Sequence, residues 1–200
     1  MNKPNGTAFE KIVAIAMTVV FISGFSAFAQ SPTPDEIAKL TAEQAKSQAA
    51  VEAQIEEQKA KIAELHLKKF SLQKTPFTDE DLVHLLEAVG FEGKALRVAW
   101  AVVKKESNGR PMAFNDNART GDSSYGIFQI NMIGGLGVAR RDKYDLNTNK
   151  ELFDPVVNAQ IAYHMSNGGE VWTSWKVGNG YNGIDQQKFL DWYNKFPKGV

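Results

Sequence analysis

The sequence predicts a mainly α-helical fold with one short β segment at a cleft, preceded by a long N-terminal helix. Two observations carry this prediction. Between Lys94 and Ser107, apolar residues recur at the helical period. From Ser123 to Ile130, by contrast, successive residues alternate in character as they do in a strand. The length of 200 residues and the ordinary apolar and charged fractions suit one compact domain with accessory segments.

Residues 1–29 have the features of an export signal. Lys3 and Lys11 precede an apolar run at positions 12–28, and small residues close the run at Ala29. The alternative is a retained membrane anchor, since the run is only slightly short for a membrane span. In either case we expect the domain to work outside the cytoplasm, in the periplasm, the cell envelope or the extracellular space. Contact with a membrane is expected only if this segment is retained.

Residues 30–72 are predicted to form a linker followed by a helical segment. Prolines stiffen the linker, and the rest is rich in Ala, Glu, Gln and Lys. Apolar residues fall at heptad-like spacing, but glutamines occupy other seam positions, so the coiled-coil pattern is weak. We expect a solvated single helix, and self-association through residues 31–72 is the alternative. The apolar positions are Val51, Ile55, Ile62 and Leu65, and the glutamines are Gln44, Gln48 and Gln58.

The domain itself is predicted to occupy residues 73–200, with its boundary near Leu72. A capping-box pattern, Thr78-Asp79-Glu80-Asp81, opens a helix. The apolar face of this helix consists of Leu82, Leu85, Leu86 and Val89. We therefore expect this helix to pack against the core of the domain.

The next helix, from Lys94 to Ser107, carries Glu106 close to its end. Three apolar residues share the face of this glutamate, namely Ala99, Val102 and Val103. Gly109 is placed to cap the helix and Pro111 prevents its continuation, so the helix should stop just past Glu106. The basic residues are expected mainly on other faces; they are Arg97, Lys104 and Lys105.

A carboxyl group in the position of Glu106 is suited to general acid catalysis. Partial burial and the negative end of the helix dipole both disfavour ionisation, so they raise the pKa of the carboxyl group. A proton that is held near neutral pH is what a general acid requires. The alternative is a surface glutamate near a helix end, because carboxylates are mostly exposed.

The alternating segment after this helix is expected to form a short strand whose two faces carry different side chains and lie in different environments. Gly126 would let another group approach the backbone closely. One set of alternating residues is Ser123, Tyr125, Ile127 and Gln129, and the other is Ser124, Gly126, Phe128 and Ile130. A polar, Gly-containing segment that faces Glu106 could position a sugar and stabilise the charge that develops on it.

Glu106-Ser107-Asn108, followed by the segment 122–131, resembles the Glu-Ser and Gly-x-x-Gln motifs of soluble lytic transglycosylases. It is also similar to the matching segment of animal C-type lysozymes. The later run 152–163, ending in 172–175, resembles the third motif of transglycosylase SLT-type domains in bacterial secreted proteins and phage virion proteins. The resemblance covers roughly residues 77–192. It implies a lysozyme-like α+β domain, either exported or virion-associated.

The resemblance implies cleavage of the MurNAc-GlcNAc β-1,4 bond in the glycan strands of peptidoglycan. In the transglycosylase family a single glutamate, here Glu106, first protonates the glycosidic oxygen. As a base it then helps the 6-hydroxyl of the same sugar to attack its own anomeric carbon, which gives 1,6-anhydro-MurNAc. In the alignment with C-type lysozymes, Ser124 occupies the position of that family's second catalytic carboxylate, which favours the one-glutamate mechanism. Asp122 is the alternative second carboxylate, at altered geometry.

Two alternatives to a lytic transglycosylase stay open. The first is a lysozyme-type hydrolase, a muramidase that cleaves the same bond. The second belongs to another class: a non-catalytic cell-wall-binding or scaffolding protein that assembles through the helical segment. The lack of cysteine separates the chain from animal lysozymes, which depend on disulfides.

Substrate-binding candidates follow from the resemblance and from side-chain chemistry. Gln129 and Asn131 can hydrogen-bond an N-acetyl or hydroxyl group, or can tie down their own loop instead. The family's Ala-Tyr-Asn-Ala-Gly motif is missing, so Tyr163 and Tyr181 are both candidates for the tyrosine near Glu106. Aromatic faces can stack on sugar rings, and a core role is the alternative for each. The candidate set is Ser124, Tyr125, Gln129, Asn131, Tyr163, Trp172 and Tyr181, with Trp175 as a further aromatic candidate.

Composition excludes several other classes of function. Lys plus Arg and Asp plus Glu each number 23, so we expect no electrostatic nucleic-acid-binding surface. Without cysteine there can be no disulfide, thiol catalysis or thiolate metal site. His66, His84 and His164 are scattered without metal-ligand spacing. We therefore expect neither a metal nor a cofactor.

Overall fold

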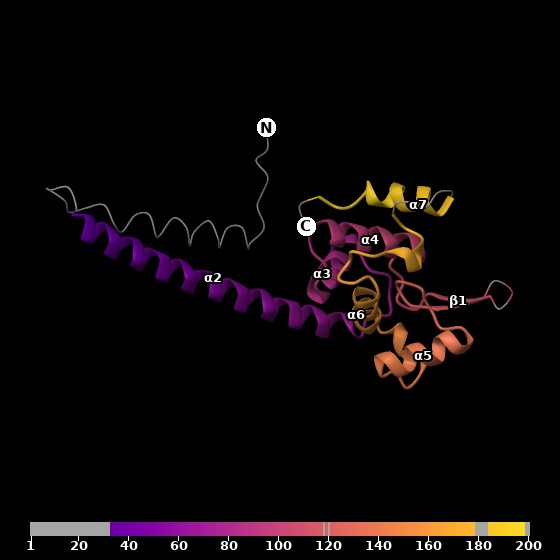
Figure 1. The fold of residues 1–200 in the computed structure, drawn as a ribbon. Helices are drawn as coiled ribbons and strands as arrows, with labels where there is room; N and C mark the ends of the chain where they lie inside the picture. Colours follow the sequence, from indigo (N-terminus) through magenta and orange to yellow (C-terminus); the bar gives the residue numbers. More distant parts are fainter. Residues whose placement is uncertain (1–32, 118, 120, 179–183, 199–200) are drawn as a thin grey trace. The chain divides into compact units, whose positions relative to one another are not determined.

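The computed structural model describes residues 33–117, 119, 121–178 and 184–198 (Figure 1). It divides into two units, Met1–Ala60 and Lys61–Val200. The predicted export signal, residues 1–29, lies outside the described residues. Among the helices of the described ranges, none is both long and apolar enough to cross a membrane.

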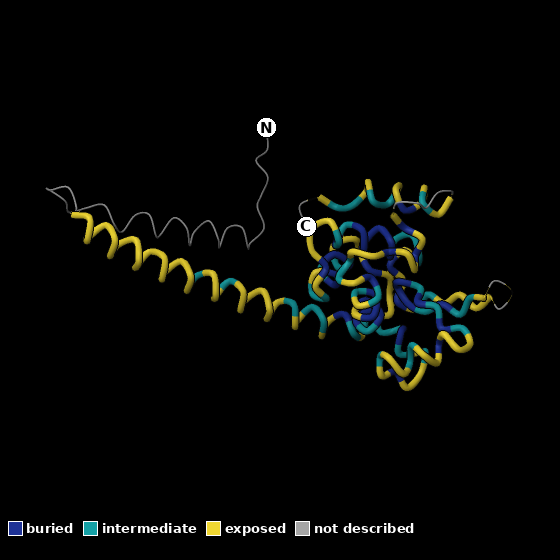
Figure 2. Tube along the Cα trace, viewed as in Figure 1, coloured by how far each residue is buried: buried dark blue, intermediate teal, exposed yellow. Residues whose placement is uncertain are grey.

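Helix α2, Pro34–Phe70, is the long N-terminal helix that the sequence predicts. Residues 34–60, which lie in the first unit, are almost all exposed (Figure 2). Acidic side chains in the first turn and basic side chains in the last turn complement the helix dipole. These observations agree with a solvated helix, and self-association of this segment stays a prediction.

The last part of α2, from Lys61 onward, belongs to the second unit. Phe70 is fully buried there, with its ring centroid 5.3 Å from that of Phe77. Leu67 packs against the same core. The sequence placed the boundary after these residues, near Leu72, because the polar composition of the segment conceals the one phenylalanine that the core buries.

Helix α4, Gly93–Ser107, has neighbours on different sides within the second unit (Figure 1). Helix α7, Ile184–Tyr193, packs on α4, and helix α3, Asp79–Val89, packs both on α4 and on α6, Pro155–Met165. Residues 98–103 of α4 are all buried. The core of the unit therefore surrounds the helix that carries Glu106.

The Thr78 cap of α3 follows the sequence, whereas the residue that ends α4 is Asn108 and not the predicted Gly109. The Thr78 side chain caps α3 by accepting a hydrogen bond of 3.1 Å from the backbone N–H of Asp81. Helix α4 ends at Ser107 because Asn108 adopts a left-handed backbone conformation, with φ 54°. Glu106 therefore lies in the last turn of α4, as predicted.

A small antiparallel sheet lies between α4 and α5 in the chain, and its order in the described residues is β1-β2-β3. The strands are β1, Phe114–Asn117, β2, Asp122–Tyr125, and β3, Ile130–Asn131. The prediction of one strand from Ser123 to Ile130 is wrong beyond Tyr125. The chain turns at Gly126, whose φ of 73° is incompatible with a continuing strand.

The remaining elements complete the second unit. They are α5, Gly134–Tyr144, and the 3₁₀ helices η1, Asn149–Phe153, and η2, Thr173–Trp175. Helix α6 begins after Asp154, whose carboxylate accepts a hydrogen bond of 2.8 Å from the N–H of Val156. Together the elements confirm the predicted fold class, which is mainly helical with a short β segment.

Candidate active site

A cavity of about 420 Å³ lies between the end of α4 and the sheet. Side chains from α4, β1, β2, β3, η2 and the start of α7 contribute to it. It brings together six of the residues that the sequence singled out, which are Glu106, Asp122, Ser124, Gln129, Asn131 and Trp175. Residues far apart in the chain thus meet around one carboxyl group.

Glu106 is held in a partly desolvated position in this cavity. Its side chain is 22% exposed. Burial raises the pKa of Glu106 above its ordinary value, the adjacent Lys105 opposes this rise, and the charges of Asp185 and Asp122 add to it. The direction of the pKa shift is the one that the sequence predicts. A carboxyl group of this kind can donate a proton at a pH where an exposed glutamate has already lost it.

Lys105 makes the closest charged contact of Glu106. Its Nζ lies 2.9 Å from Oε1 of Glu106 and donates a second hydrogen bond, also 2.9 Å, to the carbonyl of Trp175. Helical periodicity predicts that Lys105 lies mainly on another face of the helix. Its side chain nevertheless lines the cavity and is only 8% exposed, because the long, flexible stem can reach across the last helical turn.

Strand β2 supplies the polar wall of the cavity. Ser124 is buried and donates a hydrogen bond of 3.0 Å from its Oγ to Oδ1 of Asp122, which lies two residues earlier on the same face. Asn115 donates from Nδ2 to Oδ2 of the same carboxylate, at 3.2 Å. Asp122 is therefore held by neighbours on both oxygens.

The turn between β2 and β3 is fixed by a buried amide. Asn158, on α6, accepts a hydrogen bond from the N–H of Phe128 and donates to the carbonyls of Tyr125 and Leu152, each at 2.9 Å. A Cβ at Gly126 would collide with the Leu152 carbonyl and with Nδ2 of Asn158. The close backbone approach predicted at this glycine is thus confirmed, and its partners are the Leu152 carbonyl of η1 and the Asn158 side chain of α6.

Ser107 connects the end of α4 to the same turn. Its buried Oγ donates a hydrogen bond of 2.8 Å to the carbonyl of Ile127. Nε1 of Trp175 donates 2.7 Å to the carbonyl of Phe128. Through these bonds the Glu-Ser segment, the turn and η2 hold one another, which fixes the position of the cavity wall relative to Glu106.

Gln129 and Asn131 line the cavity, and both tie down their own loop. Gln129 donates from Nε2 to the carbonyls of Ala113, at 3.1 Å, and Gly126, at 2.9 Å. Asn131 donates from Nδ2 to the carbonyl of Gly121, at 2.8 Å. The loop-fixing alternative for the two residues is therefore present in the structure, and contact with a substrate stays a prediction.

The other substrate-binding candidates lie elsewhere or are not described. Tyr125 packs against Phe114, with ring centroids 4.8 Å apart, on the side of β2 away from Ser124. Tyr163 meets Phe91 edge-on at 4.9 Å, and buried Trp172 donates from Nε1 to the Gly169 carbonyl. Tyr125, Tyr163 and Trp172 are absent from the described lining of the cavity. Tyr181 lies outside the described residues.

Two comparisons with known proteins bear on this arrangement. Residues 83–177 match a family model described as a lysozyme-like domain. The human sperm acrosome-associated protein 5 is 31% identical over 107 residues, which make up 48% of this chain and 67% of that relative. This chain belongs to the lysozyme-like family. The family is of the transglycosylase and lysozyme type, which acts on peptidoglycan, and the resemblance stated from the motifs is confirmed. No solved structure matches the chain significantly.

Several residues that line the cavity of this lysozyme-like domain were not found from the sequence. They are Lys105, Asn115, Gly121, Ser174, Lys176 and Asp185. Lys105 had a signal, since it directly precedes Glu106 in the chain. Asp185 had none, because it reaches the cavity only through the packing of α7 on α4.

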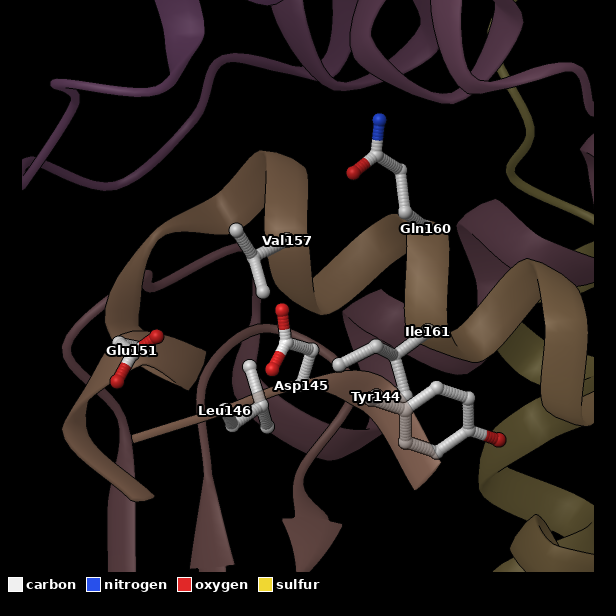
Figure 3. A pocket seen from close by; sticks show the side chains of 7 residues that line it. All are labelled: Tyr144, Asp145, Leu146, Glu151, Val157, Gln160 and Ile161. Atoms are coloured by element: carbon white, nitrogen blue, oxygen red, sulfur yellow. The ribbon is translucent and has the colours of Figure 1, made fainter. Parts of the chain in front are cut away.

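A second cavity, of about 330 Å³, lies beside α6 and shares no lining residue with the first (Figure 3). In Figure 3 the amide of Gln160 and the hydroxyl of Tyr144 point away from its centre. Asp145, whose carboxylate points toward Val157, is exposed. No group of three or more His, Cys, Asp or Glu that could hold a metal occurs in the part of the chain that the structure describes.

Proposed function

We propose that this lysozyme-like domain is a peptidoglycan lytic transglycosylase that cleaves the MurNAc-GlcNAc β-1,4 bond. The observation that carries the proposal is the state of Glu106. It is a largely buried carboxyl group with a raised pKa, in a cavity whose β2 wall presents Ser124. Such a group suits a mechanism in which one residue acts first as an acid and then as a base.

The reaction needs no water and regenerates the enzyme. Glu106 donates its proton to the glycosidic oxygen as the bond to the MurNAc anomeric carbon breaks, and the GlcNAc portion leaves with a hydroxyl group. The carboxylate of Glu106 then accepts the proton of the MurNAc 6-hydroxyl while that oxygen bonds to the anomeric carbon. The product is 1,6-anhydro-MurNAc, and Glu106 is again protonated.

A muramidase is the second candidate, and Asp122 is the observation that favours it. Asp122 lines the same cavity as Glu106, and its charge contributes to the raised pKa of Glu106. A retaining hydrolase needs a second carboxylate about 5 Å from the acid. We rank the muramidase hypothesis second because Ser124 and Asn115 already donate hydrogen bonds to Asp122, and these bonds hold its carboxylate against the strand.

Product analysis separates these two reactions. Purified peptidoglycan is incubated with the protein, and the released fragments are analysed by mass spectrometry. We expect terminal 1,6-anhydro-MurNAc, which lacks the elements of one water relative to a hydrolysis product. Fragments with ordinary reducing ends only would assign the chain to the muramidases instead.

The Glu106→Gln variant tests both enzymatic hypotheses, the lytic transglycosylase and the muramidase. Because glutamine cannot donate the proton, we expect the release of fragments to fall by about 10²–10⁴-fold, the usual contribution of a general acid–base residue. Glu87→Gln is the matched control, since burial also raises the pKa of Glu87 but this residue lies outside the cavity. Full activity of Glu106→Gln would contradict an enzymatic role for this site.

A further proposal concerns the location of the domain. We place it outside the cytoplasm on the basis of the export-signal pattern in residues 1–29.

A non-catalytic wall-binding or scaffolding protein would bind glycan strands in a pull-down assay and release no fragments. We rank that alternative below catalysis because the coiled-coil pattern on which it depends is weak.

A further inference from the structure

The side chain of Lys105 enters the candidate active site, whereas that of its neighbour Lys104 does not. Nζ of Lys105 contacts Oε1 of Glu106 and the carbonyl of Trp175, each at 2.9 Å. Nζ of Lys104 pairs instead with Asp79 on α3, at 2.9 Å. The two lysines are almost equally covered, with 8% and 10% of their side chains exposed. Their difference is one of direction, because consecutive helical residues diverge by about 100°.

The ammonium group of Lys105 is bound to both Glu106 and the Trp175 carbonyl, and this limits the motion of the Lys105 and Glu106 side chains. A lysine with a single surface partner can move through many rotamers, which is why most exposed ion pairs stabilise little. Here the ammonium group is also bound to the Trp175 carbonyl, and Trp175 is itself fixed by its hydrogen bond to Phe128. The ammonium therefore holds a defined position against one oxygen of Glu106.

The other charges around Glu106 act against the contact with Lys105. Asp122 on β2 and Asp185 on α7 both disfavour a negative charge on Glu106, as does burial. Lys105 on α4 acts in the opposite direction. Lys176, at the end of η2, also lines the cavity. Without Lys105, the carboxylate that forms once Glu106 has donated its proton would face two aspartates in a partly desolvated site.

We propose that Lys105 is a positioning residue for Glu106: it orients the carboxyl group and stabilises the carboxylate that exists between the two steps of the reaction. This inference rests on the proposed function. Lys105 thereby makes Glu106 a stronger acid than burial alone would allow, so the proton is held but can still be transferred. The residue acts through Glu106 and makes no step of its own.

The test compares two substitutions at Lys105 with one at Lys104 in the full chain. Lys105→Gln removes the charge and keeps an N–H donor for the Trp175 carbonyl, and Lys105→Arg restores the charge. Lys104→Gln is the matched control, because it removes the same charge one residue away. If the Lys105→Gln protein does not fold, Lys105→Met gives the same comparison with the apolar stem retained.

Two measurements are made on each protein. The first is the pH profile of kcat and KM for the release of anhydro fragments from peptidoglycan. The second is a carbon-13 NMR titration of the Glu106 carboxyl carbon without substrate, assigned by loss of its signal in Glu106→Gln. The NMR titration does not depend on any enzymatic activity.

We expect loss of the Lys105 charge to shift both measurements in the same direction. In Lys105→Gln, the NMR titration of Glu106 and the alkaline limb of the profile should move to higher pH. The reason is that the Lys105 charge no longer opposes the rise in the pKa of Glu106. At the optimum kcat should fall and KM should stay unchanged, since the proposed role of Lys105 is exerted through Glu106, to which its Nζ is bound. Lys105→Arg should return toward the wild-type profile, and Lys104→Gln should not depart from it.

The outcomes separate the failure of this inference from that of the proposed function. If the wild-type protein releases no fragments, the proposed function fails, and the NMR titration still shows whether Lys105 controls Glu106. If the wild-type protein is active but Lys105→Gln titrates and reacts as Lys104→Gln does, the role of Lys105 is overturned. A raised KM with unchanged kcat in Lys105→Gln would also overturn it, because it would indicate direct contact with the substrate.

Discussion

At the scale of single residues, the contrast between Glu106 and Asp122 separates the two reactions that this cavity could support. Both side chains carry a carboxyl group and line the same space. Burial raises the pKa of Glu106, whereas Asp122 accepts hydrogen bonds from Ser124 and Asn115. These hydrogen bonds hold the Asp122 carboxylate in place on β2. The environment thus favours Glu106 as the single acid and base.

The Asp122→Asn variant tests this difference. Asparagine keeps an oxygen that can accept the Ser124 bond but cannot act as a nucleophile or carry the charge. We expect the anhydro product to persist, with a loss of rate well below the about 10²–10⁴-fold expected for an acid–base residue. The measurement is mass spectrometry of the released fragments. The control is Asp185→Asn, which removes another charge from the same cavity. If Asp122→Asn lost as much activity as Glu106→Gln, a two-carboxylate mechanism would be supported.

The sequence could predict the position of Glu106 but not that of its partner. Helical periodicity places Glu106 on the face of Val102 and Val103, which are buried. The same periodicity assigned Lys105 to another face, since it locates a Cα and not the end of a long side chain. The Nζ of Lys105 is placed by the carbonyl of Trp175, a residue 70 positions later. No local pattern could have shown this contact.

At the scale of elements, the turn after β2 controls the shape of the cavity wall. It is held from two directions: Asn158 on α6 binds the Phe128 N–H, and Ser107 on α4 binds the Ile127 carbonyl. Gly126 allows η1 and Asn158 of α6 to come this close, because any Cβ there would meet the Leu152 carbonyl of η1 and the Asn158 amide. The segment that bears Gln129 is therefore rigidly attached to both helices.

Replacing Gly126 by alanine should destabilise the domain more than the same change at Gly121. Both glycines have nearly the same φ, 73° and 74°, so the left-handed conformation costs each alanine about 1–2 kcal/mol. Only Gly126 faces a close approach, because nothing lies within 4 Å of a Cβ at Gly121. We expect Gly126→Ala to lose about 1–3 kcal/mol more.

Urea denaturation of the two variants measures this difference in the free energy of unfolding. Since φ is nearly the same at the two glycines, the comparison with Gly121→Ala isolates the contribution of the collision with Leu152 and Asn158. Equal losses in the two variants would show that the turn can move away from Leu152 and Asn158, and that these two residues do not fix its position.

The strand prediction failed at this same turn for a physical reason. Alternation of side-chain character from Ser123 to Ile130 is compatible with one strand, and it holds for β2 as far as Tyr125. The competing contribution comes from Asn158, which lies more than thirty residues later and satisfies the backbone groups that a strand would have paired. In contrast, the ends of α3 and α4 were predictable, because local side chains and backbone conformations determine them.

At the scale of the whole molecule, the two units differ in what holds them. Residues 34–60 form an exposed stretch of helix, whereas residues from Lys61 onward contain the buried core (Figure 2). Phe70 shows where the second unit begins, since it is fully buried, while Leu72, two residues later, is 82% exposed. The boundary predicted near Leu72 would separate Phe70 from the core in which it packs.

Paired substitutions and truncations test where the catalytic unit begins. Phe70→Ala should lower the free energy of unfolding by about 3–5 kcal/mol, the usual cost of removing a buried phenylalanine, whereas Leu72→Ala should change it little. A chain that begins at Lys61 should therefore unfold at nearly the same urea concentration as the full chain, and one that begins at Gln73 should be much less stable. Tryptophan fluorescence follows the transition, because Trp100 and Trp175 lie in the core. Equal stability of the two shortened chains would instead place the boundary at Leu72 and leave Phe70 without a structural role.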